Sequence, residues 1–280
     1  METSRKELLV RVGIVLSLLA PFATLASAKR CLVQEKGMEG GGGGRLKDGW
    51  APSRVWATRV PLAPAGSVAV ENVQGDIAVE AWDRAEVAVT VAKTATGPSA
   101  NPDEVRIEVE SKGRSLTLRT IYPQQSDDTV RVDYRLRVPR QVRLERLRTV
   151  EGSITVRGIE GSVNARTLNG NIEQRNVSGS VVARAMNGNV LVSLRALPEK
   201  DGAVQMDTVN GHLFLVLPPQ ASADLQLSTV AGRISCDYPT TVSELLGETS
   251  RRARVGQGGV PVRLRTVRGN ISVAESEELL

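Results

Sequence analysis

Arginine recurs at intervals of nine residues in the middle of this 280-residue sequence, which could bring several like charges against one anion. Residues 129–198 hold twelve arginines, no lysine, four glutamates and one aspartate, a net charge of +7. The whole chain carries only +5, so positive charge is concentrated in this segment. We call the recurring residues the arginine ladder: Arg148, Arg157, Arg166, Arg175 and Arg184.

Two interpretations of the ladder follow from its chemistry. A stripe of arginines can bind an anionic polymer, such as envelope polysaccharide, or lipid head groups. The alternative is a solvated charged face that discourages strands from aggregating sideways. Nucleic acid is not an expected partner, because the ladder lacks the aromatic side chains on which bases stack.

No other residues have the spacing of a catalytic or metal site. Residues 149–193 contain no aspartate, which argues against the calcium-binding nonapeptide repeat and its carboxylate ligands. His212 is the only histidine and has no cysteine nearby, so it does not predict a metal site. Polysaccharide cleavage would need carboxylates that converge on one face, whereas the candidate aspartates are scattered: Asp76, Asp127, Asp128, Asp207, Asp224 and Asp237. We therefore predict no catalytic residue, metal or cofactor.

A nine-residue repeat carries the ladder. Its units read TVEGSITVR, GIEGSVNAR, TLNGNIEQR, NVSGSVVAR and AMNGNVLVS, with glycine at position four of each. Position six is always β-branched, position two is aliphatic or Met, and position eight is mostly small or aliphatic, with Gln174 as the exception. Because strand side chains alternate between two faces, positions two, six and eight are expected to point into a core and arginine at position nine outward.

The repeat predicts an all-β fold, a β-solenoid or single-stranded β-helix built from these nine-residue glycine-containing units. A period of nine is odd, so the inward face can recur only if the chain turns a corner in every unit. Glycine suits such a corner or a close approach of two backbones. If two units form one rung, Arg157 and Arg175 stack on one face, and Arg166 and Arg184 stack on the other.

The flanking sequence continues this pattern. Similar phrases with glycine surround Gly66, Gly75, Gly211, Gly232 and Gly269, and residues 85–139 alternate apolar and polar residues between turn-like clusters. Together with the closing RTVRGNISV, these phrases resemble the bacterial putative-adhesin domain family, which is related to the head domains of auto-transporter adhesins. The resemblance implies a β-solenoid in the envelope or outside the cell, and it carries over no catalytic or binding residue.

The N-terminus predicts export. Residues 1–28 have a charged start, an apolar stretch and the small-residue site ASA, as in a cleaved signal peptide, and no lipobox precedes Cys31. The alternative is an uncleaved membrane anchor. The glycine run 40–44 predicts a flexible tether over 29–57. A β-solenoid domain is then expected over 58–275, followed by an acidic tail at 276–280, with no second transmembrane segment. Cys236 is expected to be a buried free thiol, and the alternative is a disulfide with Cys31, which export permits.

These observations predict an exported, non-enzymatic β-solenoid that acts as an envelope or cell-surface binding or structural module. Its ligand-binding residues would be the arginine ladder, and its partners anionic envelope polysaccharide or lipid head groups. The alternative function is an exported carbohydrate-active β-helix enzyme, a polysaccharide lyase or hydrolase. Carboxylates that converge in one groove would favour that enzyme.

Overall fold

Strands are the only regular secondary structure in the residues that the structure, a computed structural model, describes: 53–123, 130–199, 201–245 and 248–276. The predicted signal peptide 1–28, most of the tether and nearly all of the acidic tail lie outside these residues. Within the same ranges, no helix is long and apolar enough to cross a membrane. The prediction of an all-β chain is confirmed.

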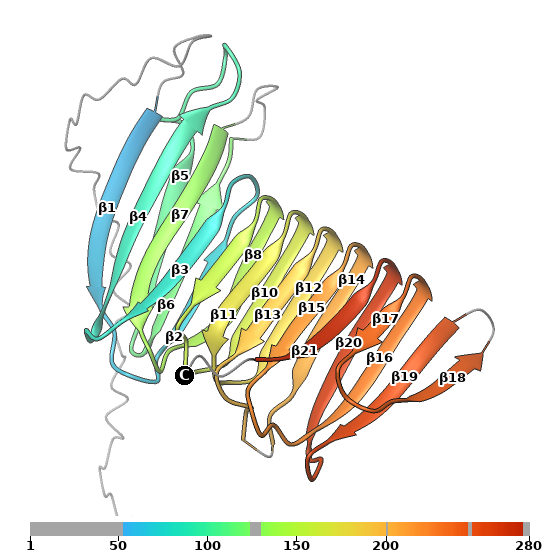
Figure 1. The fold of residues 1–280 in the computed structure, drawn as a ribbon. Coiled ribbons are helices and arrows are strands. Elements are labelled where there is room, and N and C mark those ends of the chain that lie inside the picture. The colour runs from blue at the N-terminus through green and yellow to red at the C-terminus, as the bar shows by residue number, and fades with distance from the viewer. Residues whose placement is uncertain (1–52, 124–129, 200, 246–247, 277–280) are drawn as a thin grey trace, which may run out of the picture.

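The strands form two large sheets (Figure 1). Sheet A has the spatial order β1 (Ser53–Pro61), β4 (Glu86–Ala95), β7 (Val130–Pro139), β3 (Ile77–Trp82), β9 (Ile154–Arg157), β11 (Ile172–Val177), β13 (Val190–Leu194), β15 (Leu213–Leu217), β21 (Ile271–Glu275) and β17 (Ile234–Cys236). Sheet B has the order β18 (Thr241–Leu245), β19 (Glu248–Val255), β16 (Ala223–Ala231), β20 (Val260–Arg268), β14 (Val204–Asn210), β12 (Val181–Asn187), β10 (Val163–Asn169), β8 (Arg143–Glu151), β2 (Ser67–Glu71), β6 (Ser115–Ile121) and β5 (Arg106–Lys112).

From β8 to β15 the chain alternates between the two sheets, one strand in each. Neighbours within a sheet are parallel: Val163 of β10 pairs with Val181 of β12, and Ile172 of β11 pairs with Val190 of β13. Parallel neighbours usually need a long crossover connection. Here the strand in the opposite sheet is that connection, which gives the row of stacked arrows in the middle of Figure 1.

Antiparallel strands flank this central stack. At the N-terminal end β1, β4 and β7 pair antiparallel, and at the other end β16, β19 and β18 do so. The pairing of β1 begins at Ser53, opposite Thr94, so residues 53–57 of the predicted tether belong to a strand. The sequence placed the start of the domain at residue 58 because the glycine phrases begin later and the pairing of β1 with β4 is not visible in the sequence.

Aliphatic side chains fill the space between the sheets and form one continuous core cluster. Most are Val, Ile, Leu and Ala, and each large one contributes roughly 1.5–3 kcal/mol when buried. Tyr134 is fully buried, and its hydroxyl lies 2.6 Å from Thr120 Oγ1. Burial raises the pKa of the Tyr134 phenol, so it stays neutral in the core.

Candidate functional site

The structure divides the arginine ladder between the two sheets. Arg157 and Arg175 lie side by side on β9 and β11 of sheet A. Arg148, Arg166 and Arg184 lie on three adjacent strands of sheet B, where Arg166 pairs in register with the other two. All five occupy the outward-facing positions of their strands. We call the three residues of sheet B the arginine row.

The arginine row is flanked by carboxylates, yet its centre is unpaired. Arg184 Nε lies 3.1 Å from Asp207 Oδ2 on the next strand. On the other flank, Glu71 lies opposite Arg148 but is bound by Arg146 at 2.5 Å and Arg119 at 3.0 Å. Hydrogen bonds from those two arginines hold the pKa of Glu71 below its usual value. Among the described residues, neither Arg148 nor Arg166 forms an ion pair.

The two ladder residues on sheet A are compensated instead. Glu173 Oε1 lies 2.5 Å from Arg175 Nε and 3.7 Å from Arg157 Nη2. Arg157 also stands in register with Glu80, which pairs with Arg137 at 3.7 Å. The surroundings of the ladder therefore differ between the two sheets. Glu173 contacts both ladder arginines of sheet A, whereas two of the three on sheet B have no ion pair among the described residues.

An exposed apolar row runs beside the arginine row. Its members lie on six neighbouring strands from β8 to β16. In each strand the residues just before and just after the member pair in register with those of the next strand, so the members are aligned across the sheet. Five of them are among the most exposed large hydrophobic side chains, from 38% for Leu168 to 52% for Val230, and Val150 is half-buried. We call this the aliphatic row: Val150, Leu168, Met186, Val209, Val267 and Val230.

The aliphatic row corrects the prediction that position two always points inward. Ile159 and Val177 are buried, as expected, whereas Leu168 and Met186 are exposed. The difference lies at position one. Gly158 and Asn176 there have positive φ (74° and 56°) and turn the following residue inward. In the other units position one is a strand residue such as Thr167, which is itself buried, so position two faces outward.

Buried threonines anchor this part of sheet B to the glycine corners. Thr167 Oγ1 donates to the Gly152 carbonyl at 2.9 Å, and Thr208 Oγ1 donates to the Gly188 carbonyl at 3.0 Å. Each bond joins one turn of the chain to the next, because donor and acceptor belong to successive strand pairs. The backbone under the two rows is therefore held in a fixed position.

Both rows line one shallow groove of about 780 Å³ on the outer face of sheet B. Its walls include the arginine row, Asp207, Arg265 and most of the aliphatic row. A second groove of about 1010 Å³ lies on the outer face of sheet A, where Arg157 joins Arg59, Arg135 and Arg137 over a floor of alanine and threonine. We take the groove of sheet B as the candidate site because it combines unpaired cations with an exposed apolar strip.

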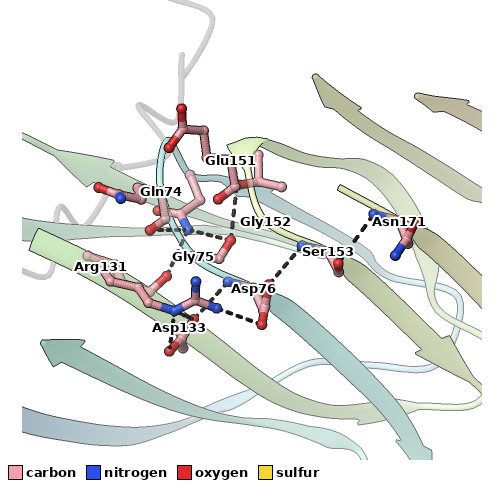
Figure 2. Close-up of polar contacts among 12 residues, drawn as sticks. Gln74, Gly75, Asp76, Arg131, Asp133, Glu151, Gly152, Ser153 and Asn171 are labelled. Carbon is pink, nitrogen blue, oxygen red and sulfur yellow. Dashed lines mark hydrogen bonds and ion pairs between the residues drawn. The ribbon is translucent and has the colours of Figure 1, made fainter. Parts of the chain in front are cut away.

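The aspartates considered for catalysis are used in structural contacts. Asp76 Oδ1 accepts from the Ser153 amide at 2.7 Å, and Asp133 Oδ1 accepts from the Asp76 amide at 2.8 Å (Figure 2). Arg131 bridges both carboxylates, at 2.6 Å from Asp76 and 3.0 Å from Asp133. The same line of side-chain-to-amide bonds continues to Asn171. These carboxylates are engaged in contacts within the protein itself.

The remaining candidates do not converge. Asp207 lies in the groove of sheet B, Asp224 pairs with Arg254, and Asp127 and Asp128 fall outside the described residues. His212 is exposed, and its Nδ1 accepts from the Asn270 amide at 2.9 Å. In the part of the chain that the structure describes, no three His, Cys, Asp or Glu side chains gather where they could hold a metal ion. Cys236 is free and half-buried rather than fully buried, and burial raises the pKa of its thiol.

Several solved structures are similar to this chain at low sequence identity. One is a "putative cell adhesion protein" from Clostridium sporogenes, 11% identical over 80% of this chain and 100% of that one, with a TM-score of 0.42. Another is a "putative adhesin" from Bacteroides fragilis, also 11% identical, over 80% and 97%, with a TM-score of 0.40. A "putative lipid binding protein" from Parabacteroides distasonis is 13% identical over 80% and 97%, with a TM-score of 0.25. Among curated proteins, no sequence matches this one.

The sequence profile of one family covers nearly all of the described chain. The profile of the Toastrack DUF4097 family matches residues 57–274, which runs from β1 into β21. The relation to auto-transporter adhesin heads, which the sequence resemblance implied, stays a prediction. With this match over more than half of its length, the chain belongs to the Toastrack DUF4097 family.

Proposed function

We propose that this protein is a non-enzymatic binding module of the cell envelope or cell surface that holds an anionic polymer along the arginine row. One observation carries the proposal: Arg148, Arg166 and Arg184 lie on adjacent strands of one exposed face, and two of them have no ion pair within the described residues. The polymers that fit are envelope polysaccharides with repeated acidic groups and arrays of anionic lipid head groups.

The electrostatics of the row support a ligand with several charges. Adjacent strands lie about 4.8 Å apart, and two cations at such a distance repel by roughly 1 kcal/mol in water. On sheet A this repulsion is relieved by Glu173. On sheet B the nearest flanking carboxylates are bound to other arginines or to one end of the row. An anionic chain lying across the strands would supply the missing counter-charges at similar intervals.

We infer that the scaffold is a β-solenoid whose rung consists of two nine-residue units, one on each sheet. The parallel pairing of residues 18 apart, such as Ala165 with Ala183, supports this description. Such stacking repeats one surface residue on every rung and so turns a sequence period into a linear binding face. The family relation and the structural contacts of Asp76 and Asp224 favour binding over the alternative of a polysaccharide lyase or hydrolase.

Location outside the cytoplasm is part of the proposal and rests on residues 1–28. Their charged start, apolar stretch and ASA site fit a cleaved secretory signal. Export would bring the arginine row to envelope polymers and keep it from cytoplasmic nucleic acid. N-terminal sequencing of protein recovered from its own host should then return Lys29 as the first residue, and an intact Met1 would contradict export.

Retention on immobilised anions tests the binding face. The triple variant Arg148→Gln/Arg166→Gln/Arg184→Gln removes the arginine row, and Arg137→Gln/Arg157→Gln/Arg175→Gln removes the same charge from sheet A. We expect the first variant to elute from a sulfated-polysaccharide resin, and from anionic vesicles, at clearly lower salt than wild type, because exposed charges are screened beyond about 10 Å at 0.1 M. The second should elute near wild type. An equal decrease of the elution salt in both variants would mean that retention depends on total surface charge and not on the arginine row.

A further inference from the structure

The proposed function leaves the aliphatic row without a role, although five of its six members are among the exposed large hydrophobic side chains of the described residues. Its six residues occupy six neighbouring strands, so the row is about 24 Å long at a strand spacing of about 4.8 Å. On sheet A, Val55 and Phe214 are the large hydrophobic residues of comparable exposure in the described ranges, and they lie on separate strands, β1 and β15. A single exposed hydrophobic residue needs no explanation, whereas a continuous exposed row marks a binding surface.

The aliphatic row is one side chain wide and has a polar border on each side. The arginine row lies two residues away along the strands, about 7 Å. On the other side, Asn187 Nδ2 donates to Asn169 Oδ1 and Asn210 Nδ2 donates to Asn187 Oδ1, both at 2.8 Å. These bonded amides are engaged with one another and form a fixed polar edge. The strip is therefore narrow, straight and preorganised.

We infer that this groove binds an anionic lipid, with its acyl chain along the aliphatic row and its acidic head group against Arg148 and Arg166. The inference rests on the proposed function, because the same arginine row supplies the cations. An acyl chain matches an apolar strip that is long and one side chain wide. The head group meets the two members of the arginine row that have no ion pair among the described residues.

Protein partners fit the strip less well. An α-helix with its side chains is about 10–12 Å across, so it would cover the arginine row or the bonded asparagines as well as the aliphatic strip. An added β-strand needs free backbone groups, and the strands β8, β10, β12, β14 and β20 are paired on both sides. The narrow width of the aliphatic row and the paired backbone of its strands therefore favour a hydrocarbon chain over a helix or a strand.

Calorimetric titration with four probes separates the parts of this ligand. Dodecyl phosphate below its micelle concentration carries both chain and anion, inorganic phosphate carries only the anion, and dodecyl maltoside carries only the chain. Vesicles of phosphatidylglycerol and phosphatidylcholine present the anion on a membrane. We expect dodecyl phosphate to bind at least about tenfold more tightly than inorganic phosphate or dodecyl maltoside, because only it contacts both rows.

Matched variants assign the binding to the row. Leu168→Thr/Met186→Thr replaces two members of the row by a polar residue that favours strands. Val55→Thr introduces the same residue at an exposed aliphatic of sheet A. The double variant should lose about tenfold in affinity for dodecyl phosphate and keep wild-type retention on sulfated polysaccharide. Val55→Thr should match wild type in both assays. Thermal unfolding of each variant checks that the fold is intact, since surface changes usually alter stability by only about 0.5 kcal/mol.

The outcomes separate the two proposals. Wild-type affinity for dodecyl phosphate in Leu168→Thr/Met186→Thr would overturn the lipid inference and leave polymer binding unaffected. Binding of the vesicles without binding of monomeric dodecyl phosphate would also overturn it, in favour of a membrane surface. Loss of lipid binding in Arg148→Gln/Arg166→Gln together with unchanged retention on sulfated polysaccharide would support the lipid site and contradict the polymer proposal.

Discussion

At the scale of single residues, Gln174 is the conspicuous polar side chain in the core of sheet A. It pairs with Val156 and Val192 on the neighbouring strands and is fully buried. Neither its Oε1 nor its Nε2 has a hydrogen-bond partner among the described residues. A buried polar group without a partner costs about 1–3 kcal/mol, so this position is a weak point of the core.

Gln174→Met should therefore stabilise the protein. Methionine is of similar length and fills the same space without a polar atom, so the free energy of unfolding should rise by about 1–3 kcal/mol. Denaturant unfolding measures it. Gln205→Met is the control, because the Gln205 amide donates to Asp207 Oδ2 at 2.8 Å on the surface. A lower midpoint for Gln174→Met than for wild type would show that the amide has a partner in solution.

The sequence identified Gln174 as an exception that faces inward, and the structure confirms that direction. The sequence also predicted that the ladder arginines face outward, because position nine alternates with the inward position eight. The prediction that position two faces inward was wrong for Leu168 and Met186. It assumed one kind of corner, whereas the chain has two, and position two faces inward after only one of them. The distinguishing signal was present at position one: Gly158 or Asn176 at one corner, threonine or alanine at the other.

At the scale of elements, a column of glycines lets successive corners of the chain pack directly on one another. A Cβ placed on Gly170 would lie 2.0 Å from the Gly152 carbonyl oxygen, and one on Gly188 would lie 1.9 Å from the Gly170 carbonyl oxygen. Their φ values, 151° and 154°, are also ones that other residues rarely adopt. Close approach and backbone conformation both require glycine here, which explains its strict recurrence in the sequence.

Gly170→Ala should destabilise the protein by at least about 2 kcal/mol more than Gly259→Ala does. Gly259 has a positive φ of 126°, but no atom lies within 4 Å of the position that a Cβ would occupy there. Its substitution therefore measures the conformational cost alone, about 1–3 kcal/mol. Thermal unfolding of both variants gives the difference. Similar losses for the two would mean that the corners can separate, contrary to the close stacking described above.

Deletions test whether two nine-residue units form one rung. Removing residues 167–184 takes out one full turn and joins Arg166 to Ala185, which pairs in register with Thr167 and so can take its place in sheet B. That variant should fold into a shorter stack with a cooperative unfolding transition. Removing residues 167–175 joins Arg166 of sheet B to Asn176 of sheet A, so half a turn is lost and the later strands would meet the wrong sheet. This variant should yield little folded protein. Equal behaviour of the two deletions in circular dichroism and thermal unfolding would contradict the two-unit rung.

At the scale of the whole molecule, alternation between two sheets decides which surface each repeated residue reaches. A nine-residue period sends successive arginines to opposite faces, and the expectation of one set on each face agrees with the pairing of Arg166 with Arg184 and of Arg157 with Arg175. The sequence could not predict the counter-charges, because Glu71 and Asp207 reach the row from distant strands. On sheet A the counter-charge is Glu173, which is close to Arg175 in the sequence. On sheet B, Glu71 is bound by Arg119 and Arg146, and Asp207 reaches only Arg184.

The central claim is that sheet B, rather than sheet A, contacts the anion, and two single charge reversals test it most directly. Arg166→Glu changes the middle of the arginine row, whereas Arg175→Glu makes the same change in the same ladder on the opposite face. The measurement is the affinity for a fluorescent sulfated oligosaccharide by anisotropy at low salt. We predict a loss of at least about tenfold for Arg166→Glu and less than about twofold for Arg175→Glu. Equal losses, or a greater loss for Arg175→Glu, would contradict the account.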